Sequence, residues 1–158
     1  MVAMRLHTGQ VGPAGEHYVA AEIHRRGGYA VTFSGNMKGI DLLASDAGHV
    51  RKIAIQVKTK TSGTWHANVA RDAHTREEDP TEEKFWVFVN LGPEHPEFYI
   101  APAWWVENDI HEHHSAYLAK HGGQRARGGT SQHHAIPVKR IVDWKDRWDV
   151  LGILPAVD

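Results

Sequence analysis

The sequence contains no cysteine, and this absence excludes both a disulfide framework and a thiolate metal site. No apolar run approaches the roughly 18 residues that cross a membrane, and residues 1–12 lack the apolar centre of a signal peptide. The net charge is only −1, which argues against a uniformly basic nucleic-acid coat protein but allows local basic patches. These absences predict a protein made for a reducing, cytoplasmic compartment.

The 158 residues, of which 41% are hydrophobic, predict one globular domain over residues 1–158. Periodicity and turn residues predict helices at 12–27, 102–122 and 144–154, and strands at 29–33, 39–60 (two), 85–91, 97–101 and 135–142. Residues 61–83 form a long polar connection in this prediction. The order of helix, strands and helix predicts an α/β sandwich around a mixed β-sheet.

The stretch Gly39–Lys60 predicts two antiparallel strands joined by a tight turn. One register pairs every apolar residue with another: Ile40 with Val57, Leu42 with Ile55, and Ala44 with Ile53. A shift of one residue would turn all of these side chains to the other face, so the register is strongly specified. On the opposite face it places Asp41 across from Gln56, with Lys58 beside them. The pattern therefore predicts a polar cluster at one end of the hairpin.

Glu16 lies in the helix predicted before this hairpin, at the centre of an inward-facing stripe formed by Val19, Ala20 and Ile23. A carboxylate within an apolar stripe is unfavourable unless it has a partner. One interpretation is that Glu16 interacts favourably with the helix dipole in the first turn. The other, which we favour because the polar cluster exists, is that it points over the sheet toward Asp41.

These residues resemble the PD-(D/E)XK nuclease superfamily. An inward Glu16 on a helix, Gly-Ile-Asp ending at Asp41, and Gln-Val-Lys ending at Lys58 follow that family's order over about residues 12–62. The family's proline is replaced by Ile40, and Gln56 is similar to the QxK variant of Mrr-type restriction enzymes. The layout also resembles Holliday-junction-resolvase-like members. The resemblance implies a restriction-endonuclease-like αβα sandwich and a metal-dependent DNA endonuclease.

Phosphodiester hydrolysis of this kind uses a divalent cation that polarises the phosphate and activates water. The resemblance implies Mg²⁺ or Mn²⁺ held by Asp41, Gln56, Glu16 and the Val57 backbone carbonyl, all of which are oxygen donors. Lys58 would position the attacking water or stabilise charge on the phosphate. Because Gln56 is neutral where the family usually has an acid, we expect weaker metal binding than at an all-acid site, or a site that has lost activity.

DNA contacts are expected from basic, amide and aromatic residues around this cluster, since such residues at phosphate positions give salt-dependent binding. The candidates are Asn36, Lys38, Lys60, Trp65, Arg71, Arg125 and Arg127. One active site cuts one strand, so the resemblance also implies a homodimer for duplex cleavage.

Two other functions are compatible with the sequence. The thirteen histidines include a cluster that suggests a zinc hydrolase: His111, His113, His114, His133 and His134. Helical zinc ligands lie about one turn apart on one face, and the three-residue spacing of His111 and His114 permits this. The other function is a nucleic-acid-binding module of the same fold without catalysis.

Overall fold

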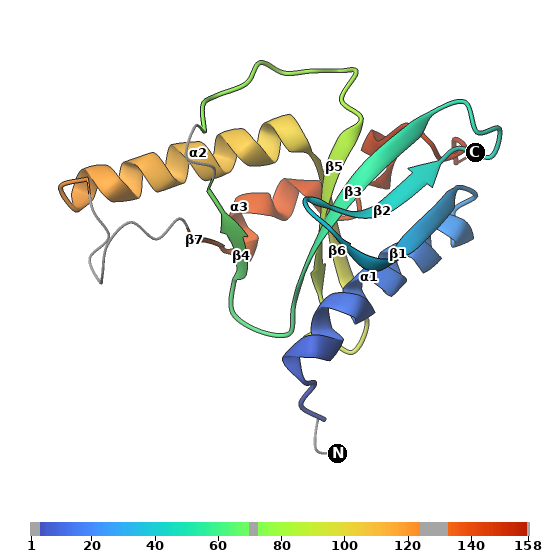
Figure 1. The fold of residues 1–158 in the computed structure, drawn as a ribbon, viewed down its shortest axis with the longest axis horizontal. Helices are drawn as coiled ribbons and strands as arrows, with labels where there is room; N and C mark the ends of the chain where they lie inside the picture. Colours follow the sequence, from blue (N-terminus) through green and yellow to red (C-terminus); the bar gives the residue numbers. More distant parts are fainter. Residues whose placement is uncertain (1–3, 70–72, 124–132, 158) are drawn as a thin grey trace.

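The computed structural model describes residues 4–69, 73–123 and 133–157, and it contains a five-stranded mixed sheet with helices on both faces (Figure 1). The elements, in chain order, are α1 (Thr8–Arg25), β1 (Tyr29–Met37), β2 (Ile40–Ser45), β3 (Lys52–Lys60), β4 (Trp65–Asn68), β5 (Lys84–Asn90), β6 (Glu97–Pro102), α2 (Ala103–Lys120), β7 (His133–Ile136) and α3 (Val138–Ile141). The mixed α/β prediction is confirmed.

The central sheet has the order β1-β2-β3-β5-β6, in which only the β3–β5 pair is parallel. Its register confirms two of the apolar pairs expected for the hairpin, Leu42 opposite Ile55 and Ala44 opposite Ile53. The ladder ends there, so the expected pairs of Ile40 with Val57 and Asp41 with Gln56 are not part of it. The tight turn before β2 uses Gly39 at a φ of 75°, a backbone conformation that favours glycine.

Two apolar cores lie on the two faces of the sheet. Strand β5 contributes to both, because Phe85 to Val89 are all buried and successive side chains point to opposite faces. Phe85, Val87 and Val89 pack on the side of α1, whereas Trp86 and Phe88 pack on the side of α2. The expectation of a strand buried on both faces is confirmed.

Helix α1 begins at Thr8, four residues before the predicted start, so Pro13 lies inside the helix. The cause is an N-terminal cap that the sequence prediction missed. The Gly9 N–H donates to Nδ1 of His7, and the His7 N–H donates to Oε1 of Gln10. Together these bonds satisfy backbone donors that a helix start otherwise leaves unpaired.

The polar segment after β3 is not the featureless connection that the sequence suggested. Residues Trp65–Asn68 form β4, which pairs antiparallel with β7 in a second, two-stranded sheet. The predicted strand at 135–142 is shorter and earlier, because Pro137 ends β7 and caps α3. The predicted closing helix is instead two 3-10 turns, Val142–Trp144 and Trp148–Leu151. No helix of the described residues is long and apolar enough to span a membrane.

Candidate active site at the start of strand β2

Asp41 stands where the β2–β3 ladder ends. The last paired residues are Leu42 and Ile55. Asp41 is the residue before Leu42 on β2, and its Oδ2 accepts a hydrogen bond of 2.7 Å from the Val57 N–H on β3. The carboxylate therefore takes the place of a backbone partner, and its position is fixed by strand β3. Its other oxygen accepts no hydrogen bond from the described residues.

Glu16 lies on helix α1, near enough to Asp41 for the two charges to interact. Gly15, Val19 and Ile23 form the buried side of the helix, and Glu16 is half-buried beside them. The predicted placement of Glu16 at the centre of the stripe is thus wrong, because Gly15 makes the closest approach to the sheet. A Cβ at Gly15 would stand 1.8 Å from Oγ1 of Thr59 on β3. This tight packing determines how near Glu16 lies to the strands.

The two carboxylates interact. Burial raises the pKa of Glu16, and the negative charge of Asp41 raises it further, while His17 opposes the shift. Two acids from different elements that repel each other in a partly buried position are unfavourable without a cation. The arrangement therefore suits a divalent metal ion, which would neutralise both.

Gln56 and Lys58 are half-buried on β3. They alternate with Ile55 and Val57, which pack in the α1 core, and so lie on the opposite face. The Gln56 side chain forms no hydrogen bond within the described part of the chain, so its amide oxygen is available. The Lys58 ammonium lies 5.7 Å from the ring centre of Trp86 and has no ion pair with any described residue. It is a cation that remains available for a phosphate.

The donor set fits magnesium better than zinc. No group of three or more His, Asp or Glu side chains among residues 4–69, 73–123 and 133–157 is arranged to hold a metal ion. Magnesium commonly uses one or two carboxylates and completes its shell with water and substrate phosphate. Asp41 and Glu16 would supply the carboxylates, with the Gln56 amide and the Val57 carbonyl as further oxygen donors.

We expect Glu16→Gln to raise the melting temperature of the metal-free protein at pH 7.5. The raised pKa means that the folded state disfavours the ionised side chain, so stability falls as pH rises through that pKa. This gain in melting temperature should shrink as the pH falls through the pKa of Glu16, because protonation removes the unfavourable charge. Thermal unfolding in EDTA at several pH values measures this. Added Mn²⁺ should stabilise wild type more than the variant, and an equal response would contradict the assignment.

The predicted DNA-contact residues differ in their exposure to solvent. Asn36 and Lys38 are exposed near the start of β2. Trp65 is only 1% exposed and donates from Nε1 to the Val89 carbonyl, so it is a core residue that cannot stack on a base. Lys60 is also buried, and its ammonium donates to the Gly63 carbonyl and lies over the Trp65 ring. These two assignments are wrong. Arg71, Arg125 and Arg127 lie outside the described residues.

Two residues of β5 that sequence reasoning missed border the site. The Lys84 ammonium lies 3.7 Å from the point where a Cβ would stand on Gly39, so it adds a positive charge beside the turn into β2. Trp86 is paired in register with Gln56. No sequence signal marks either residue, because the pairing of β5 with β3 joins segments about thirty residues apart.

The histidine cluster is partly assembled but does not suit zinc. The rings of His114 and His134 lie 5.9 Å apart. Burial, together with the neighbouring Arg140 charge, lowers the pKa of His134 to about 4. Nη1 of Arg140 lies 2.8 Å from Nε2 of His134, which therefore accepts the hydrogen bond with the lone pair that a metal would need. The Arg140 guanidinium in turn pairs with Asp109.

No protein-family model and no curated protein matches this chain. Among solved structures, the fold is similar to that of a bacterial homing endonuclease, I-Ssp6803I, with a TM-score of 0.50 and 14% sequence identity. The similarity covers 93% of this chain and 95% of the other. The chain therefore has a mixed α/β fold that is also found in an endonuclease.

Proposed function

We propose that this protein is a metal-dependent DNA endonuclease of the PD-(D/E)XK type. The observation that carries the proposal is the interaction between two carboxylates from α1 and β2, one of which is held by the backbone of β3. Strand β3 also carries Lys58, whose ammonium has no ion pair with any described residue. The similarity of the fold to a homing endonuclease supports it. The absence of cysteine agrees with a cytoplasmic location.

In this proposal each residue has a separate task. Asp41 and Glu16 hold Mg²⁺ or Mn²⁺, which when bound supplies positive charge and an activated water. Lys58 contacts the phosphate and stabilises the negative charge that grows on it during attack. Asn36, Lys38 and Lys84 contact the DNA backbone. A homodimer would bring two such sites to the two strands of a duplex.

The test is cleavage of supercoiled plasmid, single-stranded DNA and branched junctions with Mg²⁺, with Mn²⁺ and with EDTA. We expect cleavage only with a cation, and Lys58→Ala should slow it by roughly 100-fold, the effect of losing one charge-stabilising donor. A gel-shift assay in Ca²⁺ should show that the variant still binds DNA. Binding without cleavage by wild type would instead indicate a nucleic-acid-binding module, and equal cleavage by both proteins would indicate a contaminating nuclease.

Gln56→Glu should lower the Mg²⁺ concentration that gives half-maximal cleavage. The substitution adds a negative charge to the proposed ligand set, and an added charge at contact distance strengthens cation binding by roughly tenfold or more. A magnesium titration of the plasmid-cleavage rate measures the shift. Lys52→Gln serves as a control because Lys52 is exposed at the far end of β3. An unchanged titration curve for Gln56→Glu would place Gln56 outside the metal site.

A further inference from the structure

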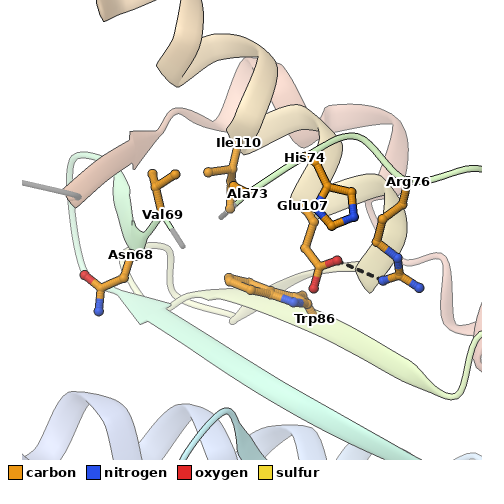
Figure 2. Close-up of a pocket in the computed structure, with 8 residues that line it drawn as sticks. All are labelled: Asn68, Val69, Ala73, His74, Arg76, Trp86, Glu107 and Ile110. Carbon is orange, nitrogen blue, oxygen red and sulfur yellow. Dashed lines mark hydrogen bonds and ion pairs between the residues drawn. The ribbon is translucent and has the colours of Figure 1, made fainter. Parts of the chain in front are cut away.

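A cavity of about 260 Å³ opens on the α2 face of the sheet, next to the candidate active site. Figure 2 shows the flat ring of Trp86 along one side and the apolar side chains of Val69, Ala73 and Ile110 facing it. The space between them is a slot with an aromatic floor and an aliphatic ceiling. Its volume is just below the range of pockets for drug-sized ligands, roughly 300–1,000 Å³, so it suits one small ring system.

Polar groups stand at the two ends of this slot, Asn68 at one end and Glu107 at the other (Figure 2). Oε2 of Glu107 accepts a hydrogen bond of 2.8 Å from Arg76, whose guanidinium also pairs with Glu82. The second oxygen of Glu107 accepts no hydrogen bond from the described residues. It is an acceptor held in place by Arg76 and left available to a ligand.

The indole nitrogen of Trp86 is a polar atom whose hydrogen-bonding capacity is unsatisfied. Its side chain is only 7% exposed, and Nε1 is buried without a hydrogen-bond partner. Buried polar atoms usually have partners, and one that lacks them calls for an explanation. Figure 2 shows the nitrogen-bearing end of the ring on the Glu107 side of the slot. A ligand in the slot would bring polar atoms to this end.

The position of the slot relates it to the cleavage chemistry. Trp86 is in register with Gln56, and the Lys58 ammonium lies 5.7 Å from its ring centre. Strand β3 separates β5 from β2, so Trp86 and Asp41 lie on strands about 10 Å apart. This spacing suits a nucleotide whose phosphate lies at the metal site and whose base lies in the slot.

We propose that the slot binds one unstacked nucleobase that carries an exocyclic amino group, next to the phosphate held at Asp41 and Lys58. The proposal rests on the nuclease function proposed above. Enzymes that take a base out of the helix hold it between aromatic and apolar side chains and read its edge by hydrogen bonds. Trp86 provides the stacking surface. The free oxygen of Glu107 accepts from the amino group, as carboxylates do from cytosine.

The test is an NMR titration of protein labelled with ¹⁵N at its six tryptophans, with the Trp86 signal assigned from Trp86→Phe. Deoxycytidine monophosphate should shift the Trp86 Nε1–H signal saturably. Thymidine monophosphate, which presents a carbonyl where cytosine has its amino group, should bind up to about tenfold more weakly, the effect of losing one hydrogen bond. Deoxyribose phosphate should leave the signal unmoved.

Glu107→Gln should reduce the preference for the cytosine nucleotide, whereas Glu112→Gln, on an exposed position of the same helix, should keep it. A Trp86 signal that no nucleotide moves, or that deoxyribose phosphate moves equally, would overturn the proposal. The titration needs neither cation nor cleavage. A protein that cuts DNA without this shift would refute only the base pocket, and one that shows the shift without cutting would refute only the nuclease.

Discussion

Asp41→Asn should slow Mg²⁺-dependent plasmid cleavage by about 1000-fold or more. Charge stabilisation by a bound metal ion contributes several kcal/mol, and each 1.4 kcal/mol is a factor of ten in rate. The substitution removes the charge but keeps an oxygen that can accept from the Val57 N–H. We therefore expect an intact fold with a disabled site. Initial rates of plasmid nicking measure the effect.

Asp143→Asn is the matched control for this prediction, because Asp143 is exposed and distant from β2 in the chain. The Asp143→Asn protein should cleave plasmid at the wild-type rate. Circular dichroism and thermal unfolding should show that Asp41→Asn remains folded. If the folded Asp41→Asn protein retains a tenth or more of the wild-type activity, Asp41 is not the principal metal ligand.

Gly15→Ala should destabilise the protein by about 1–3 kcal/mol, the usual effect of overpacking a tight contact. The added methyl would stand 1.8 Å from Oγ1 of Thr59, so α1 must move away from β3. Because Glu16 follows on the same helix, its carboxylate would move as well. Misplacement of a catalytic group by about 1 Å can slow a reaction by roughly 100-fold. Urea unfolding and plasmid cleavage measure the two effects.

Gly12→Ala is the matched control, since it lies in the same helix and nothing stands within 4 Å of its Cβ position. Alanine is the better helix former there, so this variant should gain up to about 1 kcal/mol of stability. Thr59→Ala should restore part of the stability of Gly15→Ala by removing the atoms nearest the new methyl. Equal stability of the Gly12 and Gly15 variants would show that the contact with Thr59 does not position α1.

The sequence predicted the elements that carry the proposed site because the signals for those elements are local. Alternating apolar residues in β2 and β3 specify the register that brings Asp41 next to β3, and a one-residue shift would bury the polar face. The spacing of Val19 and Ile23 predicted which side of α1 faces the sheet, although Gly15 and not Glu16 lies at the centre of that side. The missed cap at His7 changed where the helix begins but not which side faces the strands.

The predictions that failed depended on contacts between distant segments. Trp65 and Lys60 were expected to meet DNA because they lie in a polar stretch just past the motif. Pairing of β4 with β7, about seventy residues later in the chain, buries Trp65 instead. Lys60 then packs over its ring. The slot at Trp86 could not be predicted from the sequence for the same reason, because it forms only where α2 packs on β5.

The measurement that tests the metal site most directly is anomalous diffraction from crystals grown with Mn²⁺. We expect a peak within about 2.5 Å of carboxylate oxygens of both Asp41 and Glu16, as for a hard divalent cation with oxygen ligands. The same data set from Asp41→Asn should lack it. A peak at the His114 and His134 rings, or wild-type protein with no peak beside Asp41, would show that Asp41 and Glu16 do not hold the metal ion.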